Sequence, residues 1–389
     1  MNHSETLTFK TTRTLMLSGF IIVELLAGTA VKAVAAAGSF ALTGSLNTAR
    51  YNHTATLLQN GEVLVAGGVD VTASVIASAE LYNPTTAKWT VTGSMSDARE
   101  AFTATLLQSG EVLVAGGFGY YGDCLATAEL YNPSTGKWTL TGSMTEPRCY
   151  HSATLLPSGE VLVSGGTNSI YNSSNPTVAS SEIYNPSTGE WTATGSLNDS
   201  RASAATLLLE SGEVLTAGGY SNTGNGAANT YLTSAEIYDP STGEWSLTTS
   251  MSSGAGVPTT PALLSNGDML IANDAQFYDP GTATWTATGS LPTTTLPPTK
   301  ATTLQNGNVL AAGNECKNSK FYSCGFVSTN AAFLYNFSGN SWSQTGSMKS
   351  ARFHQTMTLL ANGQVLVAGG TSGNVNGSAA VSSAELYTP

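Results

Sequence analysis

The chain has 389 residues, of which only 10% are charged, and its formal net charge is −11 at pH 7. Basic residues do not cluster, so a nucleic-acid partner is not expected. The length alone would allow two or three domains. The internal repeats described below fill residues 38–389, however, so we expect a single domain there.

Residues 1–37 have the order of a secretory signal. Two basic residues precede an apolar run from Leu15 to Val23, and the segment closes on small residues at 33–37. Glu24 interrupts the apolar part, and an uncleaved anchor is the alternative. Removal of this segment would leave a mature chain without a stretch able to span a membrane. We therefore expect a protein that is secreted, periplasmic or on the cell surface.

A repeat of roughly fifty residues occupies the rest of the chain. Its first copy has strand-like runs at 54–58, 62–66, 79–82 and 88–91, with the turn Asn60-Gly61 between the first two. Such a turn between two strand-like runs indicates a hairpin, because it requires positive φ. A glycine pair or its degenerate counterpart ends the second run of each copy, at 67–68, 116–117, 165–166, 218–219, 272–273, 312–313 and 369–370.

Seven such repeats predict a seven-bladed β-propeller with four strands in each blade. The last copy stops near Tyr387, before its outer strand, whereas residues 39–44 align with that missing strand and place Phe40 where other copies have tryptophan. We expect the N-terminal strand to complete the C-terminal blade, so that the ring closes without an open sheet edge. The repeated tyrosine and tryptophan should pack between neighbouring blades.

The glycine pair followed by a spaced tyrosine and tryptophan resembles the kelch repeat, over about residues 40–389. This resemblance implies an all-β, seven-bladed kelch-type propeller. Such a scaffold hosts many functions, so the fold does not name an activity.

The four cysteines lie in or beside predicted loops. Cys124 follows the second glycine pair and Cys149 precedes the third blade, which places them at one rim of adjacent blades. We expect them to form one disulfide, and Cys316 and Cys324 of a later loop to form another. Disulfides suit an oxidising compartment; free thiols are the alternative, because connectivity cannot be deduced from sequence.

Strand direction gathers two sets of loops at one rim, which we call the long-loop face: the loops after the glycine pairs and those that lead into each first strand. The opposite rim has only short turns and is called the short-turn face. Loops on scaffolds commonly bind ligands, and aromatic residues among Asn, Ser and Gly suit sugars or protein surfaces. The candidate binding residues are Phe118, Tyr120, Tyr121, Tyr171, Tyr220, Tyr231, Phe321 and Tyr322. Simple packing of the loops is the alternative role.

Histidine enters three innermost strands shortly after an arginine, as His53, His151 and His354, with His354 one residue out of step. The segment 148–152 resembles the blade of galactose oxidase that supplies a Tyr–His pair to copper. That resemblance maps Tyr150 and His151 onto copper ligands.

The match to that family is incomplete. Its second histidine comes from a C-terminal domain, and we expect no such domain after this propeller. Its cross-linked Cys–Tyr pair has no clear counterpart, because Cys149 adjoins Tyr150 and should point to the other face of the strand. The alternative is that Arg-x-x-His is a repeat signature that joins neighbouring blades.

The sequence favours a binding module over an enzyme. Its carboxylates recur once per blade and so do not form an acid–base pair. We expect an exported, monomeric propeller that binds a glycan or surface protein through its long-loop face and needs no cofactor. The alternatives are a copper-radical oxidase-like or other sugar-modifying enzyme, and a structural cell-surface protein.

Overall fold

The computed structural model describes residues 16–17, 20–21, 38–168, 176–224, 227–253, 260–292, 298–314, 328–374 and 377–389. The chain divides into two units, Met1–Gly38 and Ser39–Pro389. In the first unit, β1 (Met16–Leu17) pairs with β2 (Phe20–Ile21). The rest of the predicted signal, residues 1–37, lies outside the described residues. No helix in the described part of the chain is long and apolar enough to span a membrane.

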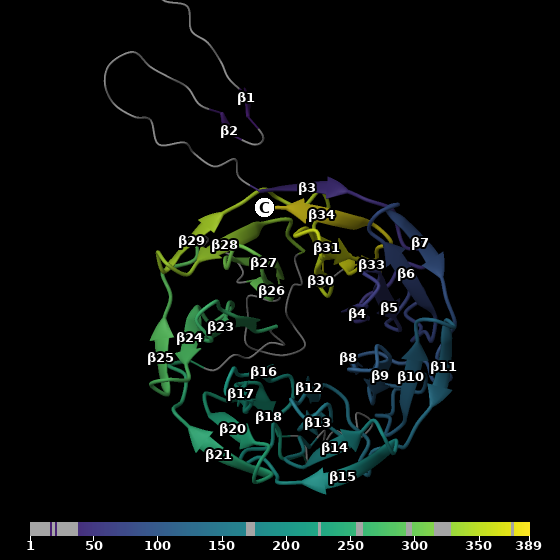
Figure 1. Cartoon of the computed structure of the whole chain (residues 1–389), viewed down its shortest axis with the longest axis vertical. Helices are drawn as coiled ribbons and strands as arrows, with labels where there is room; N and C mark the ends of the chain where they lie inside the picture. The colour runs from purple at the N-terminus through teal and green to yellow at the C-terminus, as the bar shows by residue number, and fades with distance from the viewer. Residues whose placement is uncertain are drawn as a thin grey trace, which may run out of the picture. The chain divides into compact units, whose positions relative to one another are not determined.

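The second unit is a ring of seven four-stranded antiparallel sheets (Figure 1). Blade 1 contains β4 (Thr54–Leu57), β5 (Val63–Ala66), β6 (Ala79–Asn83) and β7 (Lys88–Val91). Blade 2 contains β8 (Thr103–Leu106), β9 (Val112–Ala115), β10 (Ala128–Asn132) and β11 (Lys137–Leu140). Blade 3 contains β12 (Ser152–Leu155), β13 (Val161–Ser164), β14 (Ser181–Asn185) and β15 (Glu190–Thr194).

The remaining blades follow the same order, with the first strand innermost (Figure 1). Blade 4 contains β16 (Ala205–Leu208), β17 (Val214–Ala217), β20 (Ala235–Asp239) and β21 (Glu244–Thr248). Blade 5 contains β22 (Ala262–Leu263), β23 (Met269–Ile271), β24 (Gln276–Asp279) and β25 (Thr284–Ala287). Blade 6 contains β26 (Pro298–Thr303), β27 (Val309–Asn314), β28 (Ala332–Asn336) and β29 (Ser341–Gln344).

Blade 7 joins the two ends of the second unit, Ser39–Pro389. It contains β30 (Thr356–Leu359), β31 (Val365–Ala368), β34 (Ala384–Thr388) and β3 (Ser39–Leu42). The N-terminal strand β3 pairs with the C-terminal strand β34 and places Phe40 opposite Tyr387. The predicted seven-bladed all-β fold and its closure by the N-terminal strand are both confirmed. Two small hairpins lie in the loops between the second and third strands of blades 4 and 7. They pair β18 (Tyr220–Ser221) with β19 (Thr230–Tyr231), and β32 (Thr371–Asn374) with β33 (Gly377–Ala380).

The repeated aromatic pair packs against the preceding blade. Tyr82 lies opposite Trp89 in blade 1, with ring centroids 5.0 Å apart. Trp89 donates its indole N–H to the carbonyl of Gly44 at 2.7 Å, and the Tyr82 hydroxyl bonds Thr43 Oγ1 at 2.7 Å. Residues 43 and 44 follow the outer strand of blade 7, so the aromatic pair spans the seam where the ring closes. Large buried aromatics with satisfied polar atoms suit such a seam.

The glycine pairs allow neighbouring blades to approach closely. Gly67 and Gly68 have φ of 63° and 94°, a region that residues with a Cβ adopt at a cost. The amide of Gly68 donates to the carbonyl of Arg99 in blade 2 at 2.9 Å. A Cβ at Gly67 would lie only 2.5 Å from that carbonyl oxygen. The pair therefore serves the seam between blades.

A buried ion pair holds the loop that enters each of five blades. Arg50 Nη2 lies 3.0 Å from Glu80 Oε1, and both side chains are almost fully buried. The same carboxylate accepts the backbone N–H groups of Asn47 and Thr48 at 2.7 and 2.9 Å. The other pairs are Arg99–Glu129, Arg148–Glu182, Arg201–Glu236 and Arg352–Glu385. Buried charges require a charged, hydrogen-bonded partner.

Blades 5 and 6 depart from this pattern. Gln276 takes the place of the glutamate in blade 5 and accepts the N–H of Ser252 at 2.9 Å. In blade 6, Phe333 takes that place, and Pro292 stands where the other blades supply a backbone N–H. Proline has no N–H, so the donor and its acceptor are absent together.

Candidate functional site

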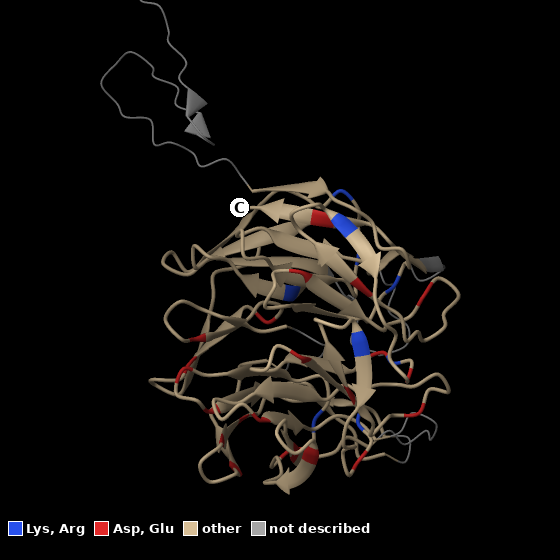
Figure 2. Cartoon of the chain, turned by 45° about the vertical axis from the view of Figure 1, so that its right-hand side comes forward, with Lys and Arg blue, Asp and Glu red and all other residues tan. Residues whose placement is uncertain are grey.

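Charged side chains are sparse over the propeller (Figure 2). The groups that could recognise a ligand are therefore few. One cluster of polar side chains lies where the innermost strands begin on the long-loop face.

Five residues with positive φ precede the innermost strands by two positions. These residues, which we call the mouth positions, are Asn52, Ala101, Tyr150, Ser203 and His354, with φ between 49° and 56°. Backbone bonds connect three of them in series, since Tyr150 N donates to Ala101 O at 3.2 Å and Ser203 N donates to Tyr150 O at 2.9 Å. Their innermost strands lie around the middle of the ring (Figure 1). Non-glycine residues in this conformation cluster at functional sites.

Polar side chains from blades 1, 2 and 7 meet at this mouth. Asn52 donates its amide N–H to Glu100 Oε2 at 2.9 Å. The rings of Tyr51 and His354 stack with centroids 6.2 Å apart. Burial raises the pKa of Glu100, and burial together with the nearby Glu100 and Asp70 carboxylates raises the pKa of Tyr51. Such a group can donate and accept hydrogen bonds to a ligand on the long-loop face.

His354 belongs to a different structural position from the other two histidines. It occupies a mouth position, whereas His53 and His151 occupy the next residue, beside the first glycine of the preceding blade. Phe102 occupies this same position in blade 2. A position that accepts either histidine or phenylalanine is a packing position. The one-residue offset seen in the sequence is therefore real.

The structure places Tyr150 and His151, the copper ligands expected from the resemblance, in the following surroundings. His151 Nε2 is engaged with Thr103 Oγ1 at 3.0 Å, and burial lowers the pKa of His151 to about 3. The Tyr150 ring packs edge-on against Phe118 at 5.2 Å. Cys149 is in a disulfide, so it is not available for a link to tyrosine. Within the described residues, no group of three His, Cys, Asp or Glu side chains could hold a metal ion.

The blade 2 loop presents two tyrosines to solvent. Tyr120 and Tyr121 are 67% and 77% exposed, and their rings pack edge-on with centroids 5.3 Å apart. The loop turns tightly, because Gly119 N donates to Asp123 O at 2.9 Å and Gly122 N donates to Gly119 O at 2.9 Å. A short, internally bonded loop presents the two rings at a low entropic cost.

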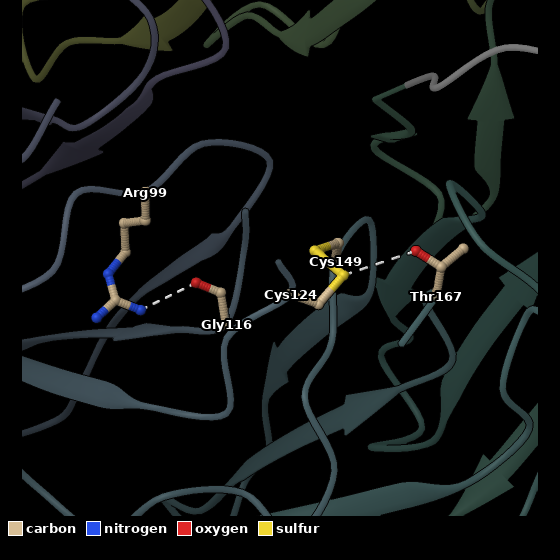
Figure 3. The surroundings of a disulfide bond; sticks show 5 residues. All are labelled: Arg99, Gly116, Cys124, Cys149 and Thr167. Atoms are coloured by element: carbon tan, nitrogen blue, oxygen red, sulfur yellow. Dashed lines mark hydrogen bonds between the residues drawn. A yellow bond between two sulfur atoms is a disulfide. The ribbon is translucent and has the colours of Figure 1, made fainter. Parts of the chain in front are cut away.

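A disulfide anchors this loop to the entrance of blade 3 (Figure 3). It joins Cys124 to Cys149, the pair suggested by the sequence, with Cα atoms 5.4 Å apart. Phe118 is only 5% exposed and packs with both cysteines. Its ring therefore packs inside the base of the loop and is not accessible to a ligand. Cys316 and Cys324 lie outside the described residues.

The other candidate aromatics lie in separate loops. Tyr220 and Tyr231 face each other across the β18–β19 hairpin of blade 4 and are partly exposed. Tyr171, Phe321 and Tyr322 lie outside the described residues. The sequence did not single out Asn52 or Glu100, which are 48 residues apart and lie on different blades. Asn52 lies two residues after Arg50 and Glu100 lies one residue after Arg99, so no shared spacing in the sequence points to this pair.

Comparison with known proteins supports the fold. The family model described as the Attractin/LZTR1 beta-propeller matches residues 39–272. The solved structure of YjhT aligns with a TM-score of 0.56 and 16% sequence identity, covering 87% of this chain and 95% of that one. At this identity the likeness concerns the fold alone. No curated protein matches the chain.

Proposed function

Because the chain belongs to the Attractin/LZTR1 β-propeller family and is a kelch-type propeller, we propose that it is an exported binding module. The observation that carries this proposal is the pair of exposed tyrosines, Tyr120 and Tyr121, on a disulfide-anchored loop. Rigid, exposed aromatic side chains are typical anchors of binding surfaces.

The proposed ligand is a surface protein that covers the long-loop face from the tyrosine loop to the mouth positions. The tyrosines supply apolar contact area, while Asn52 and Glu100 supply directional hydrogen bonds. Anchors surrounded by polar groups are the usual composition of a protein interface. A surface glycan is the other ligand class that this composition suits.

Export is part of the proposal. It rests on the disulfide between Cys124 and Cys149 and on the signal-like order of residues 1–37. Thiol labelling of protein recovered separately from the cytoplasm and from outside it tests this part. Recovery only from the cytoplasm, with both thiols reduced, would contradict export.

Binding can be tested with fluorescently labelled protein on intact cells of the source organism. Combined Tyr120→Ala and Tyr121→Ala substitution should weaken binding at least tenfold, because aromatic anchors that become buried on binding contribute roughly 1–3 kcal/mol each. Val71→Ala is the matched control, because Val71 is 65% exposed on the equivalent loop of blade 1. Neither change should alter the free energy of unfolding by more than about 0.5 kcal/mol.

Pretreatment of the cells separates the two ligand classes. Protease should abolish binding if the ligand is a protein, whereas periodate oxidation should abolish it if the ligand is a glycan. Undiminished binding by the double tyrosine variant would contradict the proposed site, whichever ligand the cells present.

A further inference from the structure

A groove opens on the short-turn face where blade 7 meets blade 1, on the rim opposite the proposed ligand site. Its volume is about 280 Å³. Blade 1 contributes Gly61, Glu62 and Asn83 to its lining, and blade 7 contributes Leu360 and Ala361. Its origin can be traced by comparing the same seam around the ring.

At the other seams, a side chain from one blade covers the turn glycine of the next. Gln59 of blade 1 reaches over Gly110 of blade 2, and its amide donates to the carbonyl of Gln108 at 3.4 Å. Gln305 of blade 6 reaches over Gly363 of blade 7 and donates to the carbonyl of Ala361 at 3.1 Å. The other covering residues are Gln108, Pro157, Glu210 and Ser265.

Blade 7 carries Ala361 at the position of these covering residues. Its methyl group does not reach across the seam. Among the described residues, no atom of a neighbouring residue lies within 4 Å of the position that a Cβ would take at Gly61. At the six other turn glycines, the nearest atom of the covering side chain lies between 2.8 and 3.5 Å from the position that a Cβ would take. The groove is thus a vacant side-chain position of the repeat.

The vacant position defines the chemistry of its occupant. Two of the residues that fill it elsewhere, Gln59 and Gln305, donate a planar N–H to a carbonyl of the next turn, and the matching carbonyl at this seam is that of Gln59. The groove also holds the Glu62 carboxylate, which accepts from Asn60 Nδ2 at 3.0 Å and from Asn83 Nδ2 at 3.2 Å. A carboxylate can accept further hydrogen bonds beyond these two.

A guanidinium group combines the planar N–H donors of the glutamine amide with a positive charge. It can donate to a backbone carbonyl and to a carboxylate at the same time. The net charge of −11 also favours the approach of a basic ligand. We propose that this groove is a binding site for an arginine side chain of a partner peptide.

The test titrates the purified protein with two blocked tripeptides, acetyl-Gly-Arg-Gly-amide and acetyl-Gly-Gln-Gly-amide, while the backbone amide signals of the protein are followed by NMR. The arginine peptide should shift the signals of Gly61 and Glu62 in a saturable way. The glutamine peptide should bind at least fivefold more weakly. No shift at Gly61, or equal affinity for the two peptides, would overturn the assignment.

Two substitutions exchange the vacant and filled positions. Ala361→Gln restores the covering side chain and should abolish the shift at Gly61. Gln108→Ala removes the cover from Gly159 in blade 3, where Glu160 and Asn185 repeat the lining of the original groove. This variant should keep the response at Gly61 and add a second one at Gly159.

These variants keep the inference falsifiable even if one of them folds poorly. Ala361→Gln introduces a side chain that the repeat already accommodates at other seams. Loss of the peptide-induced shift at Gly61 in this variant would therefore reflect filling of the groove. An unchanged response at Gly61 in Ala361→Gln would overturn the proposal. So would a Gln108→Ala variant that folds and yet shows no response at Gly159.

Discussion

Replacing Glu129 with glutamine tests the role of the buried ion pairs. Glu129 is fully buried, and it accepts from Arg99 Nη2 at 2.9 Å and from the N–H of Ser96 at 2.7 Å. Glutamine has the same shape and can still accept the backbone N–H, as Gln276 does from Ser252 in blade 5. The change therefore removes the Glu129 charge from the buried Arg99, together with the acceptor of the Asp97 N–H, which bonds Glu129 Oε1 at 3.2 Å.

Removing one partner of a buried ion pair typically costs about 3–5 kcal/mol. Arg99 keeps carbonyl acceptors at Gly116 and Thr127, at 2.9 and 3.1 Å. It also keeps the partly exposed carboxylate of Asp97 at 3.6 Å. These contacts place the expected loss at the lower end, so the free energy of unfolding should fall by about 3 kcal/mol.

Equilibrium unfolding in urea, followed by tryptophan fluorescence, measures this loss as a lower midpoint at an unchanged slope. Glu111→Gln is the control, because Glu111 is a partly exposed carboxylate on the short-turn face whose change should stay within about 0.5 kcal/mol. Adding Arg99→Met to Glu129→Gln should recover most of the stability. A single variant as stable as the parent, or a double variant less stable than the single one, would refute the reasoning.

Two kinds of titratable group, the buried histidines and the partly buried Asp274, predict opposite pH dependences. Burial lowers the pKa of His53 and His151 from 6.5 to about 3, so the unfolded chain binds more protons in that window and stability falls as the pH falls from 6.5. His151→Phe, which copies Phe102 of blade 2, should recover about 2 kcal/mol at pH 5 relative to pH 7; a variant with the parent's pH profile would contradict this. Burial raises the pKa of Asp274 from 3.8 to about 6, so the folded chain binds the extra proton and stability falls as the pH rises from 3.8 to 6. Asp274→Asn should therefore raise the free energy of unfolding at pH 7 by up to about 3 kcal/mol and leave it unchanged near pH 3.5. Urea unfolding of the variant and the parent at both pH values measures this difference. The same change in the free energy of unfolding at the two pH values would contradict the prediction.

The propeller could be predicted from sequence because its signals are local and repeated. A turn such as Asn60-Gly61, a glycine pair and a tryptophan each constrain a few residues of backbone, and seven copies make the combination specific. Closure of the ring by the N-terminal strand could be predicted because Phe40 aligns with the tryptophans of the outer strands, while the last repeat lacks its outer strand.

The candidate site was predicted less completely. Tyr120 and Tyr121 were named from their loop and are exposed, but Phe118 in the same loop is buried against the disulfide. Loop composition could not separate these cases, because burial depends on the neighbouring blade. The contact between Asn52 and Glu100 likewise joins two blades, and no local pattern reports it.

The sequence by itself determined the number of blades, the order of strands and the closure of the ring, because each depends on backbone preferences that recur along the chain. Only the tertiary structure decided which repeated residues meet. Arg50 pairs with Glu80 across 30 residues, and Ala361 leaves Gly61 uncovered only because ring closure brings blade 7 beside blade 1. Contacts of this kind depend on whether a side chain is long enough to span the seam between two blades, and the two blades lie side by side only once the ring has formed.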